Sequence, residues 1–401
     1  MERMAAENSL DIEIVRSRKS FRKEDRGNAI LSQRGEQPGV AYILPSMEPR
    51  AAGRGFVPGN TAALRQQSYY GKSKMNGAEE KAMLDEMNRR NFLEMSVAAG
   101  AAFMAPRWVA AQSAPAAQQA AKPQDDAAST PVKPTKLYDN LYLLQGVGGN
   151  MALQTGADGN LLIDSSYAPA VPRIREAIAA LAPESASAPG ILVNTHWHGD
   201  HTGGNEGMHA AGFTIFAHRL ARARLSTPQT MKLFHRTVPA SPAGALPQIV
   251  LDDSLSLWRN GDTLDLVHFD PAHTDGDIYI YFHKADVLHV GDIWFNGMYP
   301  FIDEGAGGSI GGMIRAGEKA LAVAGSSTRI IPGHGPLGTK ANLQGFRDLL
   351  TAVRDKVAAL KTGGASEEEA VAKKPTAEFD AVWGKGFMSG DVFAGIVYRT
   401  L

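Results

Sequence analysis

The stretch NTHWHGDHTGGN, residues 194–205, decides the fold. It places His196, His198, Asp200 and His201 within six positions, although the whole chain of 401 residues holds only 11 histidines. The apolar run GILV that precedes it is typical of a buried strand. In an extended chain, residues two apart point to the same side, so the first two histidines can reach one ion. A glycine then permits a sharp turn, after which the adjacent Asp and His can address a second ion.

Three more polar residues follow predicted strands further along the chain. They are His273 in DPAHTDGD, Asp292 in VLHVGDIWF and His334 in RIIPGHGP. Strand ends that lead into glycine-rich loops are where α/β scaffolds place their chemistry. The chain has no cysteine, which excludes disulfides, catalytic thiols and thiolate ligands. Any metal ion must therefore be held by nitrogen and oxygen atoms.

The ordered set H-x-H-x-D-H, A-H-T-x-G-D, V-G-D and P-G-H-G resembles the motifs of the metallo-β-lactamase superfamily, over about residues 135–340. This resemblance implies an α+β fold, a four-layer αββα sandwich with the site along one edge of its two sheets. It also implies two divalent metal ions with Asp292 as the bridge between them. One ion is then bound by His196, His198 and His273, and the other by Asp200, His201 and His334. Imidazole and carboxylate ligands suit zinc, with iron or manganese as alternatives.

Such a pair of ions supplies a hydroxide at neutral pH that can attack a carbonyl carbon. Asp200 is predicted to orient this hydroxide and to accept its proton. Asn296 is predicted to donate a hydrogen bond to the oxyanion. Asp275 and Asp277 are candidates to orient the metal ligands from behind.

The type of residue at the bridging position gives information about the class of substrate. Many β-lactamases of the superfamily carry Cys or Ser there, whereas Asp292 resembles the residue of glyoxalase II-like thioesterases and lactonases. We therefore expect a metal-dependent hydrolase that opens an ester, lactone, thioester or lactam of a small molecule. The alternatives are a dedicated β-lactamase, an oxidoreductase of the same fold, which normally carries an acidic residue where His198 stands, and a binding protein without catalysis.

Two long loops are expected to shape the pocket, at 226–248 and 293–312. The second contains aromatic residues that could wall an apolar cleft, namely Trp294, Tyr299 and Phe301. In the first, His235 is a candidate substrate contact. The pattern also predicts strands at 254–258, 263–269, 278–283 and 285–291, and helices at 171–184, 309–323 and 339–361. A further helix is expected at SEEEAVAK, opened by a Ser–Glu capping pair.

Charge argues against nucleic-acid partners. Residues 1–90 hold 16 Lys and Arg against 12 Asp and Glu, whereas residues 91–401 hold 25 against 30. The catalytic part is thus acidic, which disfavours a nuclease.

The region before the predicted domain divides into three parts. Residues 1–86 lack sustained periodicity and are expected to be disordered, or to lie upstream of a true start at Met83 or Met87. Residues 87–111 resemble a twin-arginine signal, with an ordinary amphipathic helix as the alternative. Residues 112–134 are an Ala/Pro-rich linker, and 135–401 form the domain with its C-terminal helices. We therefore expect the twin-arginine export machinery as a partner, a periplasmic or secreted location, and no stable membrane insertion after signal removal.

Overall fold

The computed structural model describes residues 12–13 and 126–401. Of the segment 1–86, which was expected to be disordered, the structure describes only Ile12 and Glu13, and these two residues form strand β1. The signal predicted at 87–111 lies outside the described residues, as does most of the linker. The last part of that linker already packs on the domain, because Ala127 is buried and the first strand of the domain begins at Lys133. Among the described residues, no helix combines the length and apolar character that a membrane crossing requires.

The first sheet has the strand order β10-β7-β6-β5-β4-β3-β2. Strands β2 to β5 are antiparallel neighbours, while β5, β6, β7 and β10 run parallel. The bounds are β2 (Lys133–Tyr138), β3 (Leu141–Gln145), β4 (Met151–Gln154), β5 (Leu161–Ile163), β6 (Gly190–Val193), β7 (Phe213–His218) and β10 (Ile249–Leu251).

The second sheet has the order β1-β11-β12-β13-β14-β15-β16. Its strands are β1 (Ile12–Glu13), β11 (Ser254–Arg259), β12 (Asp262–His268), β13 (Ile278–Phe282), β14 (Val287–His289), β15 (Arg329–Ile331) and β16 (Gly338–Thr339). The predicted strands agree with these except at 285–291, where only three residues pair. Asp286 and Gly291 adopt positive φ angles on either side of β14, which ends its extended backbone.

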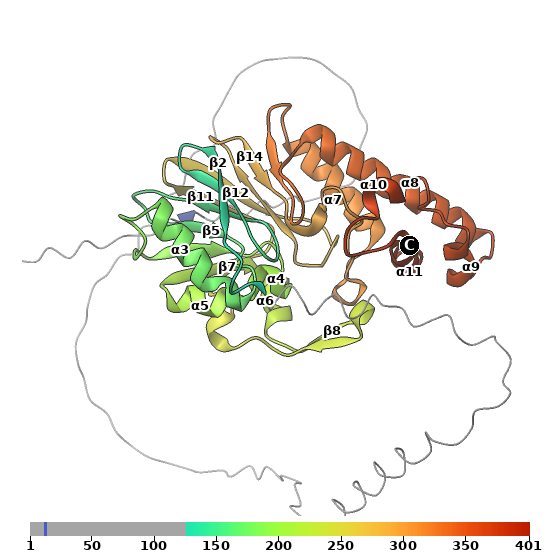
Figure 1. Cartoon of the computed structure of the whole chain (residues 1–401), viewed down its shortest axis with the longest axis horizontal. Coiled ribbons are helices and arrows are strands. Elements are labelled where there is room, and N and C mark those ends of the chain that lie inside the picture. The colour runs from blue at the N-terminus through green and yellow to red at the C-terminus, as the bar shows by residue number, and fades with distance from the viewer. Residues whose placement is uncertain (1–11, 14–125) are drawn as a thin grey trace, which may run out of the picture. The chain divides into compact units, whose positions relative to one another are not determined.

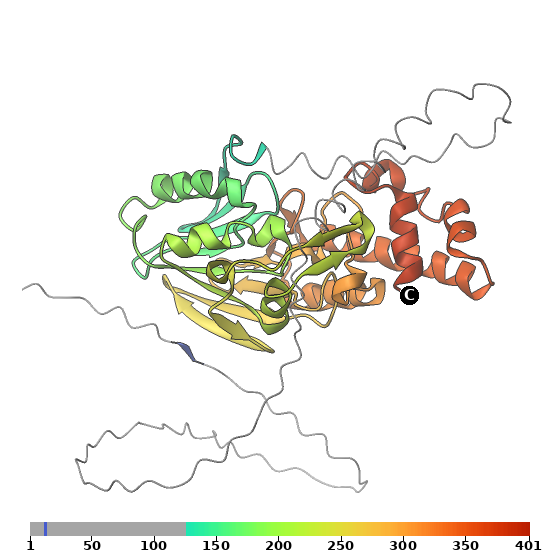
Figure 2. The same cartoon turned by 90° about the horizontal axis from the view of Figure 1, so that it is seen from below.

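Helices cover the outer face of each sheet (Figures 1 and 2). On the first sheet lie α3 (Val171–Leu181) and α5 (Asn205–Ala210), with the short α4 (Gly199–Thr202) and α6 (Arg219–Leu225) nearby. On the second lie α7 (Ile310–Val323) and α8 (Lys340–Thr362), followed by α9 (Glu367–Ala372), α10 (Asp380–Trp383) and α11 (Gly390–Arg399). Three-residue 3₁₀ turns occur at η3 (Ala168–Ala170), η6 (Gly291–Ile293) and η7 (Glu304–Ala306). The predicted αββα sandwich is confirmed, as is the capping pair of Ser366 and Glu369.

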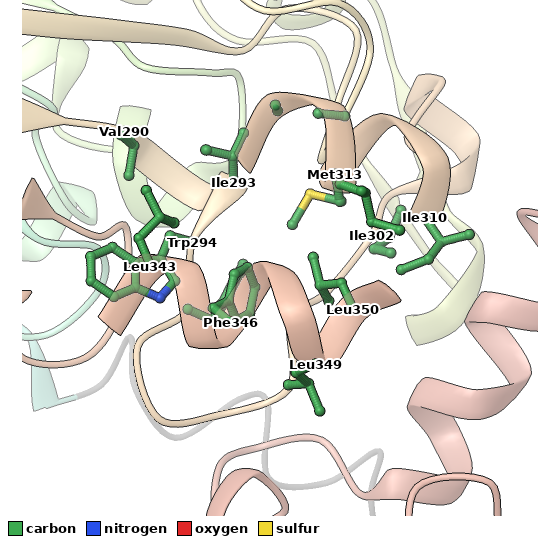
Figure 3. Close-up of a cluster of buried hydrophobic side chains, with 14 of the residues drawn as sticks. Val290, Ile293, Trp294, Ile302, Ile310, Met313, Leu343, Phe346, Leu349 and Leu350 are labelled. Atoms are coloured by element: carbon green, nitrogen blue, oxygen red, sulfur yellow. The ribbon is translucent and has the colours of Figure 1, made fainter. Parts of the chain in front are cut away.

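Three layers of buried apolar side chains fill the spaces between the sheets and helices of the sandwich. The inner layer joins side chains of both sheets, such as Ile163 and Val193 with Leu264 and Ile280. A second layer packs α3 and α5 on the first sheet. The third packs α7, α8 and α11 on the second sheet, and Figure 3 shows α8 side chains directed toward Trp294 and Met313. Full burial of each such side chain contributes about 1.5–3 kcal/mol.

The segment at 226–248 is not the structureless loop that the sequence suggested. It forms a hairpin of β8 (Gln229–Met231) and β9 (Arg236–Val238), joined by η4 (Lys232–Phe234) and followed by η5 (Ala243–Ala245). The turn of the hairpin contains His235 in the left-handed region, at φ 45°. No glycine marks this turn, so the usual hairpin signal was missing from the sequence.

Candidate metal centre

The structure brings all seven predicted ligands to one edge of the sandwich. Each follows the end of a strand: His196 and His198 come after β6, His273 after β12, Asp292 within η6 after β14, and His334 after β15. The short helix α4 then carries Asp200 and His201 back to the same place. Two groups result, in each of which the potential ligand atoms lie within 4.8 Å of one another. They are His196, His198, His273 and Asp292, and Asp200, His201 and His334.

The first group is fully buried and narrow. His198 Nδ1 lies 3.1 Å from His196 Nε2 and 2.8 Å from His273 Nε2. Asp292 Oδ2 lies 3.8 Å from His196 Nε2 and 3.5 Å from His273 Nε2. Three ring nitrogens and one carboxylate oxygen therefore surround a single point.

The second group shares Asp292 with the first. His334 Nε2 lies 3.2 Å from Asp200 Oδ2 and 3.4 Å from His201 Nε2. Asp292 Oδ1 lies 3.1 Å from His201 Nε2, and its Oδ2 lies 3.4 Å from His334 Nε2. Because both carboxylate oxygens reach ring nitrogens of this group and Oδ2 also reaches the first group, Asp292 stands where a bridging ligand must.

Hydrogen bonds behind the rings determine which nitrogen faces the centre. His201 Nδ1 donates to Asp164 Oδ2 at 2.7 Å, and His198 Nε2 donates to Asp303 Oδ2 at 2.9 Å. In a neutral imidazole the proton sits on the nitrogen that has the acceptor, so the other nitrogen turns a lone pair inward. In the neutral form that a metal ligand requires, both rings thus present an unprotonated nitrogen to the centre.

The two remaining rings of the first group follow the same rule. His273 Nδ1 donates to the carbonyl of Phe301 at 2.8 Å. The Thr195 hydroxyl donates to Asp164 and therefore accepts from His196 Nδ1 at 3.0 Å. In addition, the buried Oδ1 of Asp292 has no well-aligned hydrogen bond from the described residues, although His201 Nε2 lies 3.1 Å away. Inward lone pairs and an unpartnered carboxylate oxygen repel one another unless a cation lies between them, so these residues fit divalent metal ions.

The charges of the site favour positive occupants. Burial lowers the pKa of His334, but the carboxylates of Asp292 and Asp200 outweigh burial and raise that pKa to about 9. For the same reason the pKa of His201 lies well above its ordinary value. Burial raises the pKa of Asp292, yet His201, His334 and His196 outweigh it and hold that pKa well below the usual range. The carboxylates are therefore ionised at neutral pH, and either protons or metal ions must balance them.

Two carboxylates behind the ligands were absent from the sequence-based prediction, Asp164 and Asp303. Asp164 ends the apolar run of β5 in LLID, a signal of the same kind as the one that pointed to Asp292. Asp303 lies in the loop before η7, where no pattern distinguishes it.

Of the two predicted orienting residues, Asp277 has that position and Asp275 does not. The Asp277 carboxylate accepts the backbone N–H groups of His273 and Thr274, and so shapes the loop that carries a ligand. Burial raises the pKa of Asp277 to about 7. Asp275 instead pairs with Arg224 at 2.6 Å, and the prediction for it was wrong.

Of the three aromatic residues considered for a cleft, two pack in the core and one lies at the site. Trp294 and Tyr299 are buried in the apolar layer beneath α7 and α8, so they belong to the core. Phe301 does lie at the site, with ring centroids 5.6 Å from His198 and 5.7 Å from His273. The amide nitrogen of Asn296 donates to the carbonyl of Pro336 at 2.8 Å, and its role toward an oxyanion stays a prediction.

Comparison with known proteins agrees with this geometry. Residues 144–340 match the family described as "Metallo-beta-lactamase superfamily", and the chain has the fold of that superfamily. No curated protein matches the chain by sequence.

Several solved structures resemble the chain at low identity. A metallo-beta-lactamase from Pontibacter korlensis is 17% identical, with a TM-score of 0.46, over 55% of this chain and 99% of its own. The DIM-1 metallo-beta-lactamase is also 17% identical, with a TM-score of 0.44, over 55% of this chain and 97% of its own. The inverting sec-alkylsulfatase Pisa1 from Pseudomonas sp. is 18% identical, with a TM-score of 0.51, over 67% of this chain and 50% of its own. This chain thus spans about half the length of the sulfatase.

Proposed function

We propose that this protein is a dinuclear metal-dependent hydrolase that opens an ester, lactone, thioester or lactam carbonyl. The observation that carries the proposal is the convergence of five imidazole rings on the buried carboxylate of Asp292, with four of the rings oriented by hydrogen bonds from behind. His196, His198 and His273 would hold one ion, and Asp200, His201 and His334 the other, with Asp292 between them. The donor set suits zinc, with iron or manganese as alternatives.

When bound, such a pair of ions lowers the pKa of a water molecule and polarises a carbonyl group. The residues of the chain supply the rest. Asp200 and His334 keep side-chain exposures of 23% and 22%, whereas the other five are nearly or fully buried. Substrate therefore approaches on the Asp200 and His334 side. Burial raises the pKa of Asp200, but His201 and His334 outweigh burial and lower it, so this carboxylate is ionised at neutral pH and can accept a hydrogen bond that orients the water molecule.

Lactam hydrolysis is the second candidate. Two of the similar structures are described as metallo-beta-lactamases and a third as a sec-alkylsulfatase, but their similarity extends to the fold only. The bridging carboxylate of Asp292 favours esters and thioesters over lactams, since Cys or Ser occupies that position in many β-lactamases. We further propose export through the twin-arginine route to the periplasm or beyond it, supported by the sequence of residues 87–111.

Metal analysis combined with a substrate panel tests the proposal. We expect two metal equivalents per chain, and hydrolysis of at least one among a homoserine lactone, a thioester and a p-nitrophenyl ester. A chelator should abolish the activity and zinc should restore it. Preferred turnover of nitrocefin would support the β-lactamase alternative. A protein that binds no metal, or that binds two equivalents and hydrolyses none of these compounds, contradicts the proposal.

A further inference from the structure

The helices that follow residue 340 lie outside the matched family region, yet they hold the loop that carries Phe295 and Phe301. Tyr299 of that loop donates its backbone N–H to the carbonyl of Trp383 at 3.0 Å. Its hydroxyl donates to Asp380 at 2.8 Å, and its ring stacks on Phe393 with centroids 4.9 Å apart. The C-terminal extension, residues 341–401, is therefore attached to the loop that follows the bridging Asp292.

The same extension delivers one exposed aromatic side chain next to the metal centre. A Cβ atom on Gly386 would lie 2.7 Å from Met298 Cβ, so the chain at this point runs against the loop. The adjacent Phe387 places its ring centroid 6.2 Å from that of Phe295. Phe295 in turn stacks on the ligand His334 at 5.0 Å, with 19° between the ring planes.

These rings differ sharply in exposure. Phe295 is 1% exposed, whereas Phe387 is 55% exposed. Exposed large aromatic side chains next to a functional site are a feature of ligand-binding surfaces, because a bound apolar group removes them from water. The three neighbouring rings of His334, Phe295 and Phe387 therefore end in Phe387, an apolar ring that still contacts solvent.

The opening of the centre lies on the same side. His334, on which Phe295 stacks, is one of the two candidate ligands with appreciable exposure. Next to the first group of candidate ligands, the ring of Phe301 contacts His198 and His273. The ring of Phe234, from the β8–β9 hairpin, lies 5.2 Å from that of Phe301. Aromatic rings supplied by two loops and by the C-terminal extension thus flank the candidate ligands.

We infer that Phe387, positioned by its contact with the buried ring of Phe295, forms an apolar subsite that selects carboxylic esters with an extended alkyl chain on the acyl side. This inference rests on the proposed hydrolase function. Phe387 is a specificity-determining residue here, since it contacts the non-reacting part of the substrate. Its substitution changes KM for long chains and leaves kcat unchanged.

Kinetics with p-nitrophenyl acetate, butanoate, hexanoate and octanoate test this, because the leaving group stays constant. For the zinc-loaded full chain, we expect kcat/KM to rise roughly two- to fourfold per added methylene, the range that partial to full burial of a CH₂ group gives. Phe387→Ala should lower kcat/KM for octanoate roughly tenfold through KM and leave acetate unchanged. Phe387→Leu should restore most of the loss.

The matched control is Val382→Ala. Val382 lies on α10 of the same extension and is 60% exposed. It should leave the chain-length series unchanged. A Phe387→Ala variant that affects acetate and octanoate equally, or neither, overturns the inference.

Calorimetric titration with sodium octanoate and sodium acetate separates this inference from the proposed function, because it needs no turnover. The wild type should bind octanoate at least tenfold more tightly than acetate, and Phe387→Ala should remove most of that difference. If no ester is hydrolysed but this preference is found, the proposed function fails and the subsite stands. If esters are hydrolysed without any chain-length preference in rate or binding, the subsite fails alone.

Discussion

Asp164→Asn tests whether the hydrogen bonds behind the ligands control metal affinity. Asp164 is fully buried, and its carboxylate accepts from His201 Nδ1 at 2.7 Å and from the N–H and hydroxyl of Thr195, both at 2.8 Å. Asparagine has the same shape, but its amide nitrogen donates. If the amide oxygen keeps the Thr195 N–H, the amide nitrogen faces His201 Nδ1. His201 must then carry its proton on Nε2, which faces Asp292 and the proposed second ion.

The expected loss follows from these contacts. Removal of the partner that orients a metal-bound histidine typically lowers metal affinity about 10- to 100-fold. Hydrogen bonds to a charged group contribute about 1.5–3 kcal/mol each, so the free energy of unfolding of the metal-free protein should fall by about 3 kcal/mol. Competition with a zinc-binding dye measures the affinity, and urea unfolding measures the stability.

Asp275→Asn is the control for this experiment. Its carboxylate pairs with Arg224 at 2.6 Å and contacts none of the candidate ligands. We expect wild-type zinc affinity in this variant. If Asp164→Asn also bound both equivalents with wild-type affinity, the outer hydrogen bond would have no part in metal binding and the reasoning would be refuted.

Three further predictions concern other parts of the molecule. Asp303→Asn should weaken mainly the ion held by the first group, because Asp303 orients His198 at 2.9 Å; loss of both ions together in metal analysis would contradict it. Burial and the stacked ring of His268 lower the pKa of His218 to about 4. The folded protein therefore keeps this ring neutral below pH 6.5, where the unfolded chain takes up a proton, so about 3 kcal/mol of stability is lost as the pH falls from 6.5 toward 4. His218→Gln should therefore reduce the fall in unfolding free energy over that range, and an unchanged pH profile would exclude the effect. Leu350→Ala, at a fully buried position of α8, should cost about 2–5 kcal/mol in urea unfolding while zinc affinity stays within twofold.

The sequence predicted the metal centre well because its ligands sit in short motifs at strand ends. An apolar strand places the next residues at a sheet edge. Gly335, at φ 93°, permits the turn after His334, and Gly204 permits close approach after His201, because a Cβ atom there would lie 2.3 Å from the carbonyl oxygen of Ser165. Local pattern places the ligands after β6 of the first sheet and after β12, β14 and β15 of the second, and the packing of the two sheets then brings them together.

The same reasoning could not reach the contacts that come from distant segments. Asp303 meets His198 across 105 positions, and Phe387 meets Phe295 from an extension whose helices show only ordinary amphipathic patterns. The sequence left open whether Trp294 and Tyr299 line a cleft or pack in the core, because an aromatic residue in a loop after a ligand is compatible with both. Only the packing of α7 and α8 over that loop decides between the two.

The central claim is that seven side chains hold two ions around the carboxylate of Asp292. Anomalous diffraction from crystals of the zinc-loaded protein tests this most directly. The account predicts two peaks, one among His196, His198 and His273 and one among Asp200, His201 and His334, each within coordination distance of Asp292. A single peak, no peak, or peaks away from these residues would contradict it.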